Sequence, residues 1–211
     1  MAGAAGAARE NCMNYIRTFL MCALCVFSGT GSAAAAGAFG IELGSDVGLY
    51  RHAETPVSER WQISMYEITP PSPDARFDTY AVDTFQGKII RIMASSPDDP
   101  SADASATLNT LEGLKDELIA RYGEPSLNME EVADAGDDLR GYLADEGGLE
   151  VVEWNFAGAS TDKPGAVYVF LAGSDTGHGQ ASYCTLYLES RDYPAVSDMA
   201  DQMEQRGGER P

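Results

Sequence analysis

The chain has 211 residues, of which 33 are Asp or Glu and only 14 are Lys or Arg, so its formal net charge is −19 with histidine neutral. Such a negative field repels phosphate backbones and anionic lipid head groups, which argues against a protein that binds nucleic acid or a membrane surface. It favours a cationic partner, such as a basic protein or a divalent cation, although acidity also serves solubility alone.

Residues 1–38 are predicted to be an N-terminal extension followed by an export signal, because residues 1–12 are rich in alanine and glycine and have no pattern of their own. Met13 to Arg17 is short and positively charged, residues 18–27 are continuously apolar, and residues 28–38 are small. These are the three parts of a secretory signal peptide, and the apolar run is shorter than the about 20 residues that a membrane-spanning helix needs. Alanine-x-alanine cleavage sites end at Ala36 and at Ala38. We therefore predict a periplasmic or secreted protein that touches the membrane only through its uncleaved signal peptide.

The remaining chain is predicted to form one domain over residues 39–205, followed by a disordered tail over residues 206–211. Cys184 is the only cysteine beyond the signal, so we expect no intrachain disulfide even in an oxidising compartment. Residues 39–211 contain 12 basic and 32 acidic side chains, hence a net charge of −20. Met13, the second methionine, is an alternative start of translation because the signal pattern begins there, and this net charge is the same for either start.

Several segments alternate apolar and polar residues with the period of a β-strand. Residues 39–44 and 61–68 are the first two, and the prolines after residue 68 end the second because proline lacks the N–H that a sheet needs. Residues 76–85 and 88–93 flank Gln86-Gly87, which predicts a β-hairpin. Further strands are predicted over residues 149–156, 166–172 and 182–190.

One long helix is predicted to end at about Tyr122. Leucine and isoleucine recur at three- and four-residue spacing before that point, and Gly123 is suited to the helix C-terminus. A shorter helix is predicted over residues 194–205, whereas residues 129–148 are acidic and interrupted by glycines, which predicts a long loop. The candidates for the N-cap of the long helix are Ser101, Asp103 and Ser105.

Strands before and after a single long helix predict an α+β fold. We expect a mostly antiparallel sheet of about six strands, with one main helix packed on one face and a short C-terminal helix on the same face. This layout resembles that of small exported α+β proteins, such as periplasmic inhibitors and envelope-assembly accessories, with which the chain shares no diagnostic motif.

His178 is the candidate for an acid–base or ligand-binding role, because it lies between two glycines in a predicted loop. A hairpin turn also explains these glycines. His178 precedes Cys184 by six residues, as a base beside a cysteine nucleophile could. Cys184 shares a strand face with Leu186 and Leu188, however, which predicts a small buried side chain.

Two acidic loops are candidates for binding calcium, which prefers carboxylate and carbonyl oxygens. Neither loop has the spacing of the EF-hand, and a solvated acidic loop explains each of them equally well. Cysteine and histidine are too few for a structural zinc site, so no metal or cofactor is predicted. The loops contain Asp98, Asp99 and Asp103, and Glu130, Glu131, Asp134, Asp137 and Asp138.

Four tyrosines in predicted strands lie on faces opposite to apolar neighbours. They could form a recognition surface if one face of the sheet is uncovered, or they could pack beneath a helix or loop. The tyrosines are Tyr66, Tyr80, Tyr183 and Tyr187.

The chain has no phosphate-binding loop, nucleophile elbow or nucleotide fingerprint. We therefore predict a non-catalytic protein that binds a basic envelope protein or a small ligand. An inhibitor or immunity protein for a basic hydrolase is one version of this hypothesis. The alternatives are a hydrolase that uses His178 or an acidic loop, and a calcium-responsive domain.

Overall fold

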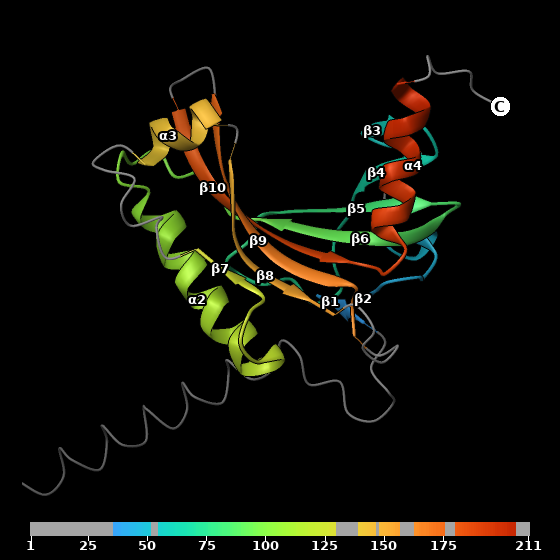
Figure 1. Cartoon of the computed structure of the whole chain (residues 1–211), viewed down its shortest axis with the longest axis horizontal. Helices are drawn as coiled ribbons and strands as arrows, with labels where there is room; N and C mark the ends of the chain where they lie inside the picture. Colours follow the sequence, from blue (N-terminus) through green and yellow to red (C-terminus); the bar gives the residue numbers. More distant parts are fainter. Residues whose placement is uncertain are drawn as a thin grey trace, which may run out of the picture. The chain divides into compact units, whose positions relative to one another are not determined.

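The computed structural model describes residues 36–51, 55–129, 139–146, 148–156, 163–175 and 180–205. Its main feature is an antiparallel sheet of eight strands in the order β3-β4-β5-β6-β10-β9-β8-β7, with helices on both faces (Figure 1). The strands of this sheet are β3 (Ser58–Arg60), β4 (Ile63–Glu67), β5 (Thr79–Phe85), β6 (Lys88–Ser95), β7 (Leu127–Asn128), β8 (Leu149–Asn155), β9 (Ala166–Asp175) and β10 (Gln180–Glu189).

The predicted α+β class is confirmed, and the sheet has more strands than the about six expected. The strands β3 and β7 have three and two residues and lie at the two edges of the sheet, too short to show an alternating pattern. Residues 39–44 contribute no strand to the main sheet. They belong to a separate hairpin of β1 (Gly37–Ala38) and β2 (Ile41–Glu42), which is followed by a 3-10 helix, η1 (Val47–Leu49).

The long helix α2 (Ser105–Tyr122) packs along one face of the sheet, which we call the α2 face. Its leucine stripe is buried there, as the three- and four-residue spacing predicts. Cys184 is fully buried in the same core, which confirms the prediction of a small buried side chain. The core includes Leu111, Leu114 and Leu118 of α2 and Tyr80, Val82, Ile92, Val152, Trp154, Val167, Val169, Leu171, Leu186 and Leu188 of the sheet.

The N-terminus of α2 is capped from a residue outside the predicted candidates. The Asp99 carboxylate accepts hydrogen bonds from the N–H groups of Ala106 (2.8 Å) and Thr107 (3.2 Å). Ser101 and Asp103, two of the candidates, accept only longer bonds of 3.3 Å from the first N–H of the helix. Asp99 lies six residues before α2 and reaches it through a turn of the loop, which helix-capping rules based on adjacent positions do not anticipate.

A short helix, α3 (Leu139–Glu146), occupies part of the segment predicted as a loop over residues 129–148. Its Leu139 and Leu143, one turn apart, are buried in the core of the α2 face. The prediction of a long, partly ordered loop is therefore wrong for residues 139–146, which are helical. Two buried residues among acidic residues and glycines are too few to show a helical periodicity.

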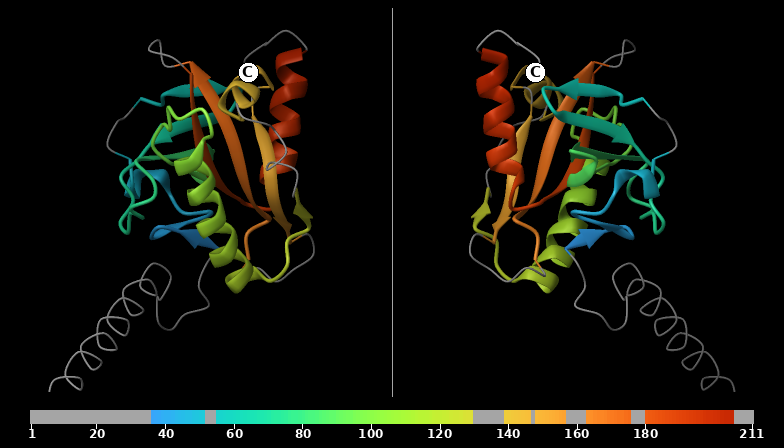
Figure 2. Two further views of the ribbon diagram at one scale, coloured as in Figure 1. Left: turned by 90° about the vertical axis from the view of Figure 1, so that its left-hand side faces the viewer. Right: turned by 90° about the vertical axis from the view of Figure 1, so that its right-hand side faces the viewer.

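The C-terminal helix α4 (Tyr193–Gln205) lies on the opposite side of the sheet from α2, on what we call the α4 face (Figure 2). Tyr193, Val196 and Ala200 pack there against Ile63 and Ile90. The expectation that both helices share one face is therefore wrong, because an amphipathic pattern shows which side of a helix is buried but not which face of a sheet buries it. No helix in the described part of the chain is long and apolar enough to span a membrane.

Candidate functional site

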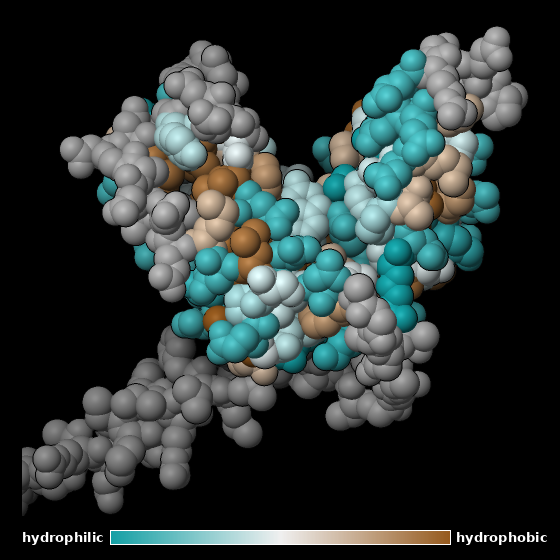
Figure 3. Space-filling view, viewed as in Figure 1, coloured by the Kyte–Doolittle hydropathy of each residue, from teal (hydrophilic) through white to brown (hydrophobic). Residues whose placement is uncertain are grey.

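The α4 helix covers only part of the α4 face, where it packs against Ile63 of β4 and Ile90 of β6. Over β10, β9 and β8 the surface is hollowed between the part that carries α4 and the part that carries α3 (Figure 3). Directly opposed residues of antiparallel strands share a face, so the strand register defines rows of side chains across this hollow. We call the hollow the trough, and its rows are Asp83–Arg91–Glu189, Met93–Tyr187–Tyr168–Glu153 and Thr185–Phe170–Glu150.

The first row is a ladder of alternating charges across three strands. Arg91 Nη2 lies 2.5 Å from Asp83 Oδ2, and Arg91 Nη1 lies 3.9 Å from Glu189 Oε1. The exposed fractions of the two acidic side chains are only 6% and 10%, and that of Arg91 is 20%. One guanidinium thus lies beside two buried carboxylates, and the ladder has a formal charge of −1.

Aromatic rings enclose the Arg91 guanidinium and continue beyond it. Its Cζ lies 4.5 Å from the ring centre of Tyr193, on α4, and 5.3 Å from that of Tyr187. The Tyr187 ring stacks on Tyr168, with 4.7 Å between ring centres and 13° between planes, and Phe170 meets Tyr187 edge-on. The rings of Tyr168, Phe170 and Tyr187 are all partly exposed. They form an aromatic wall along the trough.

Two further carboxylates, Glu150 and Glu153, lie on β8 at the edge of the trough. Both are partly exposed, and neither forms an ion pair with a basic side chain of the described residues. Burial and the neighbouring Glu153 charge raise the pKa of Glu150 above its ordinary value. This edge therefore holds negative charge that the described part of the fold leaves without a cation.

Burial has the largest effect on the pKa values of the two acidic residues in the ladder. It raises the pKa of Asp83 and of Glu189, although Arg91 opposes the shift at both. Burial and the adjacent Glu189 carboxylate also raise the pKa of the Tyr168 phenol, which therefore stays protonated and donates a hydrogen bond of 2.7 Å to Glu189 Oε1. The ladder is thus a polar part of the trough with low water access, where a guest charge would interact strongly.

The structure separates the four tyrosines that were candidates for a recognition surface, with packing beneath a helix or loop as the alternative. Tyr187 lies in the trough, and Tyr183 lies on the same face, four residues before it on β10. Tyr66 and Tyr80 lie on the opposite, α2 face. The hydroxyl of Tyr80 is buried and donates to the carbonyl oxygen of Asp74 (2.9 Å), so this side chain has a structural role.

His178 lies outside the described residues, as does the acidic loop of Glu130 to Asp138, so the hydrolase hypothesis stays a prediction. In the other acidic loop, Asp99 caps α2, and no three Asp, Glu, His or Cys of the described residues gather as a metal site would need. Burial raises the pKa of Cys184 to about 12, which leaves this thiol protonated and unreactive at neutral pH.

Sequence reasoning missed most of the trough, namely Tyr168, Phe170, Arg91 and its two acidic partners. One signal for them was present. Asp83 and Arg91 are charged residues in the interior of largely apolar strands, and a charge in such a position is costly unless a partner neutralises it. Which charges pair depends on the strand order, which the sequence does not show.

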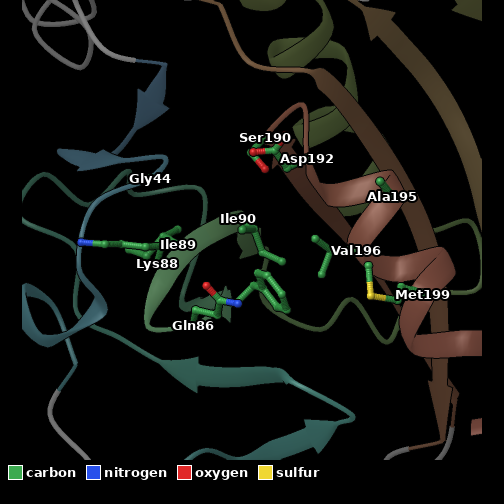
Figure 4. A pocket seen from close by; sticks show the side chains of 11 residues that line it. Gly44, Gln86, Lys88, Ile89, Ile90, Ser190, Asp192, Ala195, Val196 and Met199 are labelled. Carbon is green, nitrogen blue, oxygen red and sulfur yellow. The ribbon is translucent and has the colours of Figure 1, made fainter. Parts of the chain in front are cut away.

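A second hollow lies between α4 and the β5–β6 turn, with a volume of about 620 Å³. Ile90, Val196 and Met199 face it from its two sides, whereas the Lys88 side chain extends away from it (Figure 4). The Lys88 ammonium lies 3.9 Å from a carboxylate oxygen of Asp46. This hollow suits an uncharged apolar group, whereas the trough suits a cation.

The fold and the site together define an α+β protein with an eight-stranded antiparallel sheet and an acidic, aromatic trough on one face. No protein-family model, curated protein or solved structure matches this chain. The trough and the charge are therefore the features that point to a function.

Proposed function

We propose that this chain is an exported, periplasmic, non-catalytic binding protein whose trough holds a segment of a basic protein. The observation that carries the proposal is the trough itself, a concave sheet face with the partly exposed rings of Tyr168, Phe170 and Tyr187. Aromatic rings offer large, rigid contact areas at little cost in conformational entropy, and they are enriched at protein interfaces.

The charge of the trough defines the kind of partner. The rows of the trough contain four carboxylates, those of Asp83, Glu150, Glu153 and Glu189, and one guanidinium, that of Arg91, which gives a formal local charge of −3. A concave wall of low dielectric constant focuses such a field and raises the local concentration of cations. The net charge of −20 over residues 39–211 would add long-range attraction and speed the encounter with a basic protein.

An inhibitor of a basic envelope hydrolase, such as a lysozyme, is the most specific version of this proposal. A lysozyme carries the positive charge that the trough would attract, and both proteins would meet in the cell envelope. Calorimetric titration with purified lysozyme, together with an assay of its cell-wall hydrolysis, tests this version. We expect binding that weakens steeply with salt, because the attraction between exposed charges is screened.

A pair of variants with the same net charge separates the trough from the overall charge. We expect Glu150→Lys/Glu153→Lys to lower the affinity for lysozyme by about tenfold or more, which corresponds to about 1.4 kcal/mol. The control Glu112→Lys/Asp116→Lys changes exposed residues of α2 on the other side of the sheet and should change it less than about threefold. Equal losses in the two variants would contradict a site in the trough.

Affinity capture from periplasmic extract at low and high salt tests the proposal for partners other than lysozyme. The wild-type chain should enrich a basic protein that the Glu150→Lys/Glu153→Lys variant does not enrich. Failure of lysozyme to bind would remove the lysozyme version. If, in addition, the wild type enriched nothing over this variant, the whole proposal would fall.

A further inference from the structure

We propose that the outer end of the trough is a subsite for an arginine side chain of the partner, stacked on Tyr168 and Phe170 and paired with Glu150 and Glu153. This inference rests on the proposed function and specifies which group of the basic partner the trough holds. The four residues lie together because β8 and β9 are paired with Glu153 opposite Tyr168 and Glu150 opposite Phe170.

The other end of the trough already shows this chemistry within the chain. There the guanidinium of Arg91 lies between the rings of Tyr193 and Tyr187 and is paired with Asp83. A planar cation between aromatic faces and beside a carboxylate is a favourable arrangement, and guanidinium suits it better than ammonium. The fold thus fills one aromatic and acidic site of the trough with its own arginine.

The outer end offers the same groups without a cation of the described chain. Tyr187 and Tyr168 stack along the row from β10 to β9, so the far side of the Tyr168 ring is turned towards β8 and Glu153. An arginine side chain placed there would extend the stack of Arg91, Tyr187 and Tyr168 by one more planar group. Its fork of N–H donors would meet the carboxylates of β8.

The aromatic part of this subsite is held in place before any partner binds. Gly148, just before β8, has a positive φ of 114°, and a Cβ atom at this position would overlap the ring of Phe170. The ring therefore packs directly on the Gly148 backbone. Towards β10, the Phe170 ring meets the Tyr187 ring edge-on, with 6.5 Å between the ring centres. A ring fixed in this way loses little entropy when it receives a guest.

Arginine is favoured over lysine and over neutral groups for separate reasons. A lysine ammonium is strongly hydrated and cannot stack as a plane, so it would use the carboxylates of Glu150 and Glu153 but not the ring faces. A neutral group of the same shape would use the rings but leave the two carboxylates without a counter-charge. Only a guanidinium uses both parts of the subsite.

Three peptides of the form acetyl-(Gly-Xaa)₄-amide, with Xaa as arginine, lysine or citrulline, test the inference by calorimetry against the exported protein. Citrulline has the shape of arginine but no charge. We expect the arginine peptide to bind at least about threefold more tightly than the lysine peptide and at least about tenfold more tightly than the citrulline peptide. The variant Glu150→Gln/Glu153→Gln should abolish the preference for arginine over citrulline, whereas the control Glu112→Gln/Asp116→Asn should keep it.

The variant Phe170→Leu tests the aromatic part and should reduce the preference for arginine over lysine. Should this variant fail to fold, the comparison of the arginine and lysine peptides on the wild type decides the point. Equal affinities for these two peptides, or for the arginine and citrulline peptides, would overturn the arginine subsite. In either case lysozyme binding that depends on Glu150 and Glu153 would leave the proposed function standing. Loss of that dependence would remove the lysozyme version, and the proposed function would fall as well only if affinity capture also showed no partner that depends on these two residues.

Discussion

Arg91 is the residue on which the trough depends. Its guanidinium lies between two buried carboxylates and two tyrosine rings, so it is at once a structural cation and the centre of the candidate site. A buried ion pair adds little stability compared with apolar residues, but removal of one partner leaves an uncompensated charge and is strongly destabilising. A variant of Arg91 therefore has to be tested for its stability as well as for its binding.

We predict that Arg91→Met lowers the free energy of unfolding by about 3 kcal/mol or more at pH 7.5. The pKa values of Asp83 and Glu189 are already raised, and loss of the cation raises them further. A raised pKa means that the folded state binds the proton more tightly, so stability falls as pH rises through the range between the unfolded and folded values. The deficit should therefore be smaller at pH 5 than at pH 7.5.

Urea unfolding of the wild type and of Arg91→Met at both pH values measures this difference. Lys88→Met is the matched control, because the Lys88 side chain is 57% exposed and its nearest carboxylate oxygen is 3.9 Å away. We expect this control to change stability by less than about 0.5 kcal/mol. A deficit of Arg91→Met that did not change with pH would show that packing, and not charge, is the main role of Arg91.

At the scale of single residues, the sequence predicted what depends on one strand alone. Cys184 was expected to be buried because it alternates with polar neighbours and shares a face with leucines, and it is buried. Tyr80 and Tyr187 have the same local pattern, yet one lies in the core and the other in the trough. The two tyrosines differ because they lie on opposite faces of the sheet. The local pattern of a strand does not show which of its two faces lies against the core.

At the scale of elements, the start of α2 depends on Asp99, which joins the loop to the helix. One of its carboxylate oxygens accepts from Ala106 and Thr107, and the other accepts from the N–H and hydroxyl of Ser101. Although burial opposes ionisation, these hydrogen bonds hold the pKa of Asp99 below its ordinary value. The residue thus stabilises the fold most when it is charged.

We predict that Asp99→Ala lowers the free energy of unfolding by about 1–2 kcal/mol at neutral pH, as the loss of a helix cap does. A lowered pKa gives stability that is present above the unfolded value of 3.8 and is lost as pH falls through the folded value. The difference from the wild type should therefore shrink in stronger acid. Unfolding curves at pH 7 and pH 3 measure it, and Asp99→Asn, which keeps one acceptor, should lose less. An effect that grew in acid would argue against the cap.

The elements that were predicted well are those with many repeats of their period. The strands β5, β6, β9 and β10 and the helix α2 each carry enough apolar residues to show a period of 2 or 3.6. α3 has only Leu139 and Leu143 to bury, and β7 has two residues, so neither has a pattern. These short elements are held by their contacts with the sheet, through packing of α3 in the core and pairing of β7 with β8.

At the scale of the whole molecule, the hairpin of β1 and β2 bears on the predicted cleavage of the export signal. Ala38 and Phe39 are buried, with exposed fractions of 4% and 2%, and the Phe39 ring packs against Tyr80. A cut after Ala38 would remove β1 and place a charged amine on a buried residue, at a cost of several kcal/mol. A cut after Ala36 leaves both residues in the fold.

We therefore predict that the exported protein begins at Gly37 and not at Phe39. Intact-mass spectrometry of the protein from a periplasmic fraction distinguishes the two, which differ by the masses of one glycine and one alanine. The variant Ala36→Leu should block this cut, because the cleavage rule requires a small residue there. Processed protein that starts at Phe39 would contradict the prediction, and protein with residues 13–36 still attached would contradict export with cleavage.

The sequence by itself determined the α+β class, the main strands and α2, the acidic charge and the absence of an obvious catalytic motif, because each of these depends on composition or on local periodicity. Only the tertiary structure decided that α4 lies opposite α2 and that Arg91, Tyr187, Tyr168 and Glu153 lie on one face of the sheet. The physical reason is strand register. Neighbours across a sheet come from distant parts of the chain, and a shift of one residue would turn a strand's whole set of side chains to the other face.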